Sequence, residues 1–268
     1  MTLSASTSYR LTSNLSFNSV LGQPSMSAFI SIEADHVQLD LNGFSILCSN
    51  VLTGQPCTGS PTGTDGIYVT GGQARIRNGS FRGIPRTAIS RGFPGGAHGT
   101  HVEDVRMSNI GFRGVEVGHR AHIRSSTISV CGDTGITAGE ESVVVGNRVR
   151  ECGNSGFFIG RRSRVQDNVS AFNGGQGFTV FDDSLVQGNV ASTNGLAGFQ
   201  LTVTNIGVVP GGLARENVAT GNASFGLSII GDWVFSDNVI QLNNSGGSQT
   251  SGGVQGTGNV CGTTPGCP

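Results

Sequence analysis

The sequence predicts an all-β solenoid, a single stack of coils of about 21 residues each. Glycine contributes 44 of the 268 residues, far above its usual share of about 7 %, and only 12 % of residues are charged. Such units bury their apolar faces only by stacking on one another. Two motifs recur at a spacing of 21 residues: Val144, Val165 and Val186 each begin Val-x-x-Asn, and Gly156, Gly177 and Gly198 each begin Gly-Phe.

The repeat assigns residues to columns that run along the stack. The step from Val186 to Ala214 is 28, so we place seven extra residues in the segment from Val203 to Gly212. Asparagine amides bond to their own turn and to the next asparagine, and asparagine tolerates a left-handed backbone, so we expect two turn ladders. The predicted inward column is Val102, Ile123, Val144, Val165, Val186, Ala214 and Phe235. The predicted asparagine columns are Asn147, Asn168, Asn189, Asn217, Asn238 and Asn173, Asn194, Asn222, Asn243.

The coils are expected to form one long domain with a different segment at each end. Residues 1–27 are predicted to form an N-terminal strand and cap, because residues 9–17 alternate apolar and polar side chains. Residues 28–245 are predicted to form the coils, with alternate large side chains such as Phe157 and Ile159 pointing inward. Residues 246–268 break the pattern and are predicted to form a C-terminal cap or tail.

The composition of the chain limits which partners it can bind and which catalytic groups it can use. A net charge of −1 gives no reason to expect nucleic acid as a partner. No apolar run is long enough to span a membrane. Residues 1–8 lack the basic and apolar regions of a secretion signal, so we expect any such signal to lie outside this sequence. Lysine is absent, which excludes a lysine base.

The six cysteines favour an oxidising location, either secreted or extracytoplasmic. The pair Cys48 and Cys57 and the pair Cys261 and Cys267 each close a short loop, so we predict disulfides. Cys131 and Cys152 are 21 residues apart and should stack on successive coils. They are predicted either to form a third disulfide or to remain two buried thiols.

The repeated coil resembles the right-handed parallel β-helix proteins of the pectate-lyase-like superfamily. The resemblance rests on the pattern Val-x-x-Asn-Val-x-x-x-Asn-x-x-x-Gly-Phe together with residues 39–44 and 76–81, and it covers about residues 28–245. It implies a single right-handed parallel β-helix. That superfamily contains lyases, hydrolases, epimerases, tailspikes and adhesins, so the resemblance does not specify an activity.

The family's catalytic motifs do not transfer to this chain. Thr64-Asp65-Gly66 is similar to part of a polygalacturonase-like motif, but its partner residues are missing. Residues 82–86 have the composition of a pectate-lyase-like arginine signature with the wrong spacing. The Asp-Pro-His-Asp run of alginate epimerases is absent.

Four histidines form the sharpest candidate site. His98 and His119, and likewise His101 and His122, are 21 residues apart, so each pair should stack on adjacent coils about 4.8 Å apart. Glu140 continues the column of His98 and His119, and these three side chains are predicted to bind a divalent metal, Zn²⁺ or Ca²⁺. The alternative is that the pairs are surface histidines bonded to turn carbonyls.

Charges of alternating sign follow in the same turn. Arg120, the pair Glu140 and Glu141, and the pair Arg161 and Arg162 occur on successive coils. They are predicted either to form a ladder of ion pairs that holds the register or to bind an acidic sugar through the arginines. Glu216 and Asp237 lie one coil apart. They are predicted to be the acid and nucleophile of a retaining glycosidase, to bind Ca²⁺, or to cap backbone amides of their turns.

Two functions remain open from the sequence. One is a carbohydrate-active enzyme, a lyase or hydrolase of an acidic polysaccharide. The other is a non-catalytic β-solenoid, either an adhesin-like surface protein or a structural protein. Such a solenoid could associate as a homotrimer through an apolar flank. The enzyme hypothesis assigns catalysis to His101, His119, Arg120 and His122, and substrate binding to Glu140, Arg161 and Arg162.

Overall fold

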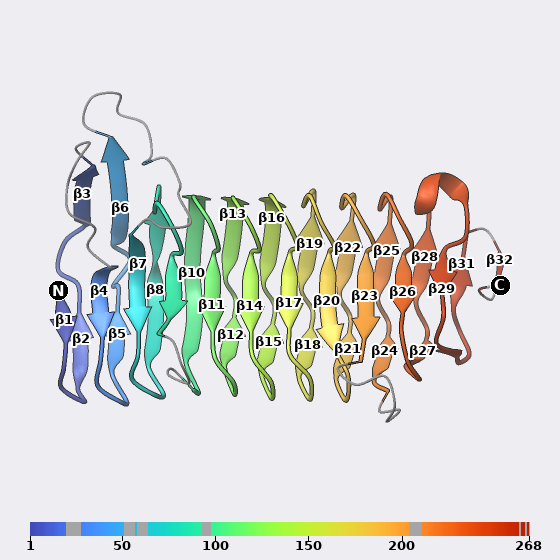
Figure 1. The fold of residues 1–268 in the computed structure, drawn as a ribbon, viewed down its shortest axis with the longest axis horizontal. Helices are drawn as coiled ribbons and strands as arrows, with labels where there is room; N and C mark the ends of the chain where they lie inside the picture. The colour runs from blue at the N-terminus through green and yellow to red at the C-terminus, as the bar shows by residue number, and fades with distance from the viewer. Residues whose placement is uncertain are drawn as a thin grey trace.

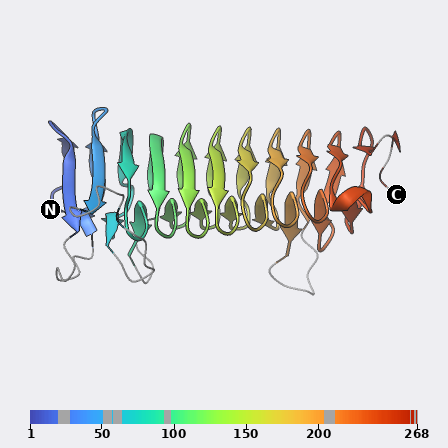
Figure 2. The ribbon, with the colours of Figure 1, turned by 90° about the horizontal axis from the view of Figure 1, so that it is seen from above.

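The computed structural model is a straight stack of coils with the termini at opposite ends (Figure 1). It describes residues 1–19, 28–50, 57, 64–92, 98–203, 211–262, 264, 265 and 267. Seen from above, each coil follows the last at an even spacing (Figure 2). No helix among the described residues is long and apolar enough to cross a membrane.

Strands of successive coils pair in parallel and form three ladders along the stack. Ladder A contains β1 (Thr2–Leu3), β4 (Ala28–Ile32), β7 (Asp65–Val69), β9 (Ile89–Arg91), β11 (Val115–Val117), β14 (Ile136–Ala138), β17 (Phe157–Ile159), β20 (Phe178–Phe181), β23 (Phe199–Thr202), β26 (Leu227–Ile229) and β29 (Thr250–Ser251). Ladder B contains β2 (Ser8–Arg10), β5 (Gln38–Asp40), β8 (Arg75–Arg82), β10 (His101–Ile110), β12 (His122–Arg124), β15 (Val143–Val145), β18 (Arg164–Gln166), β21 (Leu185–Gln187), β24 (Leu213–Arg215), β27 (Val234–Ser236) and β30 (Val254–Gln255).

Ladder C shares the long strands β8 and β10 with ladder B. Its other strands are β3 (Leu15–Ser19), β6 (Ser45–Asn50), β13 (Thr127–Cys131), β16 (Arg148–Cys152), β19 (Val169–Ala171), β22 (Val190–Ser192), β25 (Val218–Thr220), β28 (Val239–Gln241) and β31 (Val260–Cys261). A short 3-10 helix, η1 (Asn244–Gly246), precedes the last coil, and β32 (Thr264–Pro265) pairs antiparallel with β31. The architecture is a single right-handed parallel β-helix, as predicted.

The ladders include the first and last segments of the chain. β1, β2 and β3 pair with β4, β5 and β6, and β29, β30 and β31 pair with β26, β27 and β28. The division of the chain at residues 27 and 245 stays a prediction. The predicted insert, residues 203–212, lies mostly outside the described residues.

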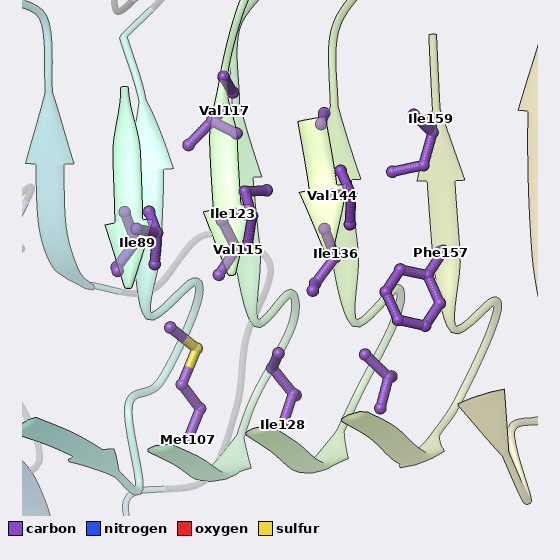
Figure 3. Close-up of a cluster of buried hydrophobic side chains, with 14 of the residues drawn as sticks. Ile89, Met107, Val115, Val117, Ile123, Ile128, Ile136, Val144, Phe157 and Ile159 are labelled. Atoms are coloured by element: carbon purple, nitrogen blue, oxygen red, sulfur yellow. The ribbon is translucent and has the colours of Figure 1, made fainter. Parts of the chain in front are cut away.

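The core is a column of apolar side chains inside the coils (Figure 3). The predicted inward column from Val102 to Phe235 is buried throughout. Phe178 stacks between Phe157 and Phe199, with ring centroids 4.6 and 4.8 Å away. The glycine before each phenylalanine is needed for close packing, since a Cβ on Gly156 would lie 2.0 Å from the Ser170 hydroxyl.

Both predicted asparagine columns are present and buried. In each step the Oδ1 of one asparagine accepts the backbone N–H and a side-chain N–H of the preceding one, as between Asn168 and Asn147 at 2.9 and 3.0 Å. The structure extends the columns to Asn259 and Gln249. The expected left-handed backbone falls on the residue before the asparagine, for example Asp167 with φ of 54°. The asparagine itself is thereby free to aim its amide along the stack.

Three disulfides are present, joining Cys48 to Cys57, Cys131 to Cys152, and Cys261 to Cys267. The two loop-closing disulfides are confirmed. Cys131 and Cys152 are register partners in β13 and β16, and they form the third bridge that the sequence left open.

Candidate functional site

The predicted stacking of the histidines is confirmed. His101 and His122 open β10 and β12, are register partners, and have ring centroids 4.5 Å apart with an angle of 16° between the planes. His98 and His119 lie in the turns that lead into these strands, with centroids 5.3 Å apart. All of these positions follow from the 21-residue coil.

The rings of His101 and His122 belong to a polar surface that we call the histidine face, formed by Arg75, His101, Glu103, His122 and Arg124. These side chains line a hollow of about 140 Å³ on ladder B. A second hollow, of about 370 Å³, adjoins it and shares Arg75 and His101. Glu103 pairs with Arg124 at 2.6 Å and with Arg75 at 3.7 Å.

The electrostatics of the histidine face favour a neutral imidazole at His101. Burial lowers the pKa of His101, and the positive charges of His122, Arg75 and Arg124 lower it further, against a smaller opposing effect of Glu103. The side chains of His101 and His122 form no hydrogen bond within the part of the chain that the structure describes. His101 is therefore available to accept a proton beside two guanidinium groups.

His98, His119 and Arg120 lie in the neighbouring turns with the acidic pair Glu140 and Glu141, around a hollow of about 290 Å³ that Arg162 also lines. The Nδ1 atom of His119 accepts the backbone N–H of Glu140 at 3.0 Å. Arg120 pairs with Glu141 at 3.1 Å. The turn is thus already held together by its own contacts.

The predicted metal site of His98, His119 and Glu140 is not assembled. The Glu140 carboxylate instead pairs with Arg161 at 3.1 Å and with Arg162 at 2.7 Å. These guanidinium groups hold the pKa of Glu140 below its usual value, and the hydrogen bond from Arg162 is the main cause. Among the described residues, no three histidine, cysteine or acidic side chains are grouped to hold a metal ion. The side chains of this turn therefore fit the ion-pair ladder and do not fit Zn²⁺ or Ca²⁺.

Sequence reasoning missed a buried carboxyl group on ladder A. Asp65 accepts hydrogen bonds from Ser90 at 2.6 Å, Arg86 at 2.7 Å and the Thr87 backbone at 3.1 Å. Burial raises the pKa of Asp65, although these three partners oppose the shift, and the charge of Glu116 raises it further. The signal was Thr64-Asp65-Gly66, which resembled a hydrolase motif without its partners.

The Asp65 cluster continues into an ion-pair network. Glu116 pairs with Arg113 at 3.0 Å and with Arg91 at 3.9 Å, and Arg113 also pairs with Asp133 at 2.8 Å. Each of these arginines already has a carboxylate partner. This network is thus suited to joining coils. The imidazole rings of His101 and His122, by contrast, form no hydrogen bond with the described residues.

Known proteins with a similar sequence pattern or structure have the same β-helix fold. A family model described as the right handed beta helix region matches residues 42–209. The mannuronan C-5 epimerase AlgE6 A-module of Azotobacter vinelandii superposes with a TM-score of 0.66 at 16 % identity, over 95 % of this chain and 69 % of that one. The periplasmic alginate epimerase AlgG gives 0.60 at 13 % identity, over 88 % and 70 %.

A tailspike protein is also similar. The Dettilon tailspike protein superposes with a TM-score of 0.63 at 14 % identity, and the match covers 94 % of this chain but only 59 % of the tailspike. A comparison with curated protein sequences found no match. The structural likenesses concern the fold, and the family model covers more than half of the chain. The chain therefore belongs to the right-handed β-helix family.

Proposed function

We propose that the protein is an extracytoplasmic carbohydrate-active enzyme that acts on an acidic polysaccharide by removing a proton beside a carboxylate. The observation that carries this proposal is the stacked pair His101 and His122, which shares a hollow with Arg75 and Arg124. A neutral imidazole supplies the base, and the guanidinium groups supply the positive charge that the reaction requires.

The reaction follows from the position of these groups. His101 takes the proton from the carbon next to the sugar carboxylate, and the electron pair moves into the carboxyl group. Arg75 and Arg124 stabilise the resulting dianion. When the electron pair returns, it forms a double bond between that carbon and its ring neighbour, and the bond from this neighbour to the glycosidic oxygen breaks. The released oxygen receives the proton that His101 took. His122, stacked on His101, orients the ring and is the second group near the leaving oxygen.

Elimination fits the histidine face better than epimerisation. His101 and His122 project from the same side of ladder B, as their register pairing requires. Both therefore approach a bound polymer from one side, whereas epimerisation needs a proton delivered from the opposite side. The proposal is accordingly a polysaccharide lyase.

The neighbouring turn is proposed to flank the substrate. His119 and Arg120 border the same region, but His119 accepts a backbone N–H and Arg120 is paired with Glu141. Arg161 and Arg162 are both paired with Glu140. Arginines are paired with a carboxylate at both places, since Arg75 and Arg124 pair with Glu103. The imidazoles differ, because His119 already accepts a backbone N–H, so we place the reacting centre at His101 and His122 on the histidine face.

Two further observations support the substrate class and the location. The similar epimerases act on mannuronan or alginate by their names, and both are acidic polysaccharides. The three disulfides suit an oxidising compartment outside the cytoplasm, and one similar epimerase is described as periplasmic.

The test is an activity screen on alginate, polygalacturonate and hyaluronan, with absorbance of unsaturated ends as the readout. We expect His101→Ala to lower the rate by about 10²-fold to 10⁴-fold. His98→Ala is the matched control from the turn and should have a far smaller effect. Activity that survives both His101→Ala and His122→Ala would refute the assignment. Uptake of solvent deuterium without unsaturated ends would identify epimerisation instead.

One observation favours the alternative, a non-catalytic surface protein that self-associates. The outward column of ladder B changes from polar to apolar along the stack, and Val234 and Val254 are 41 % and 51 % exposed. Light scattering of the purified protein distinguishes a monomer from a self-associated oligomer. A monomer without activity on any polymer would exclude both functions.

A further inference from the structure

The N-terminal half of ladder C has a hollow of about 490 Å³ that is separate from the histidine face. It spans β6, β8, β10 and β13, and most of its lining residues have polar side chains. The lining residues are Ser45, Leu47, Ser80, Phe81, Arg82, Arg106, Met107, Ser108, Thr127 and Ser129.

Strand register arranges the outward residues in two columns. One column runs through Ser45, Ser80, Arg106, Thr127 and Arg148, and the other through Leu47, Arg82, Ser108, Ser129 and Arg150. Adjacent strands are about 4.8 Å apart, so Arg106 and Arg148 are roughly 10 Å apart along the stack. Arg82 lies diagonally across from Arg106 on the neighbouring strand. We call Arg82, Arg106 and Arg148 the arginine face.

The arginine face carries unbalanced positive charge. Between β6 and β16 neither column contains an acidic residue. Within the described ranges, Arg82, Arg106 and Arg148 have no ion pair, whereas Arg75, Arg77 and Arg124 on ladder B are each paired with a carboxylate. Farther along ladder C, Val169, Val190 and Val218 follow Arg148 in the same column. Cationic character is thus confined to the coils around the hollow.

Hydroxyl groups surround these arginines. Ser45 and Ser80 bond to each other at 2.6 Å, and Ser129 donates to the Met107 carbonyl at 3.3 Å. The hydroxyls of Ser108 and Thr127 form no hydrogen bond to the described part of the chain. Guanidinium groups recognise oxyanions in bidentate geometry, and free hydroxyls match the hydroxyls of a sugar.

We propose that the arginine face binds carboxylate or sulfate groups of an anionic polysaccharide. This site holds the polymer on ladder C and requires no catalysis by the histidine face. Single-stranded nucleic acid is disfavoured because it needs exposed aromatic side chains for base stacking. The aromatic residue of the hollow, Phe81, is only 1 % exposed.

Binding measurements by affinity electrophoresis test the proposal on the full chain. The probes are alginate for carboxylate, dextran sulfate for sulfate, neutral dextran, and a single-stranded oligonucleotide. We expect one or both anionic polymers to bind, with an affinity that falls as salt is added. The double variant Arg82→Gln/Arg106→Gln should lower this affinity at least about tenfold. Arg164→Gln, which removes an exposed arginine from ladder B, is the control and should leave binding unchanged.

The outcomes separate this site from the catalytic proposal. Loss of polymer binding in the double variant, with Arg164→Gln binding as wild type, supports the arginine face whether or not the protein has lyase activity. Equal effects of Arg164→Gln and the double variant would show a mere dependence on net charge and overturn it. Binding of the oligonucleotide alone, or of no probe, would also overturn it. A lack of lyase activity with intact, arginine-dependent binding would refute only the catalytic proposal.

Discussion

The imidazole rings of His101 and His122 lie face to face, 4.5 Å apart, although 21 residues separate them in the chain. Their stacking is a direct product of the coil length, because register partners in adjacent coils project in the same direction. It places two histidines and the guanidinium groups of Arg75 and Arg124 around one hollow. This arrangement leads to a prediction about pH.

Lyase activity should persist below the usual imidazole range. Burial and positive neighbours lower the pKa of His101. His101 therefore stays a neutral base until the pH falls below 6.5, the ordinary pKa of an imidazole. The acid limb of kcat/KM should therefore lie below about 6.5. Arg124→Gln should move that limb to higher pH, since it removes a positive charge and leaves Glu103 paired with Arg75 alone. An acid limb above 6.5, or no movement in Arg124→Gln, contradicts a base at His101.

Stability should fall in acid partly through Asp133. Burial alone would raise the pKa of Asp133, but hydrogen bonds from Arg113 and Asn154 outweigh it and lower the pKa. A lowered pKa in the folded state means that Asp133 stabilises the fold above its unfolded pKa. This contribution is lost as pH falls through the folded pKa. Asp133→Asn should cost on the order of 1–3 kcal/mol at pH 7 and flatten the acid decline.

Urea unfolding between pH 3 and pH 7 measures this effect. Asp237→Asn is the control, because Asp237 is an exposed turn residue with a left-handed backbone that asparagine also tolerates. If Asp133→Asn and Asp237→Asn give the same pH profile, the role given to Arg113 and Asn154 is wrong.

Removal of the bridge between Cys131 and Cys152 should destabilise the centre of the stack. The bridge closes a loop of 21 residues, for which chain entropy suggests about 3 kcal/mol. Both sulfur positions are buried, so the double variant Cys131→Ser/Cys152→Ser also leaves two hydroxyls in the core. Cys131→Ala/Cys152→Ala separates these effects and should be the milder change. Denaturant unfolding of both double variants, with wild type as reference, provides the measurement.

The asparagine column should be sensitive to a single substitution. The Oδ1 of Asn168 accepts two N–H groups of Asn147, and its Nδ2 donates to the Val144 carbonyl. Asn168→Ala leaves these buried groups without partners and should cost about 3 kcal/mol or more. Gln166→Ala, two residues earlier, should change the free energy of unfolding by less than about 0.5 kcal/mol. Comparable costs for the two substitutions would show that the column contributes little.

Much of the fold followed from the repeat in the sequence. A fixed coil length converts sequence separation into register, so the inward column, both asparagine columns and the two histidine pairs were predictable. The family resemblance supplied the handedness. The loop-closing disulfides were also predictable, because short loops bring their ends together.

The tertiary structure decided the partners of individual side chains. Glu140 was as close in register to His119 as to Arg161, and only the packed turn directs its carboxylate to the two arginines. Asp65 acquires its raised pKa from burial against later coils, which no local pattern encodes. In both asparagine columns the left-handed residue is the one before the asparagine, such as Asp167, and the repeat alone did not show this.

By itself, the sequence determined which residues share a coil position, because the period of the chain sets the register of every strand. Only the tertiary structure decided which of those neighbours form ion pairs and which stay unpaired. Side-chain direction depends on competition among all charges and hydrogen-bond donors around a site. That competition joins Glu140 to the arginines of its turn, and it leaves His101 and the arginine face available to a ligand.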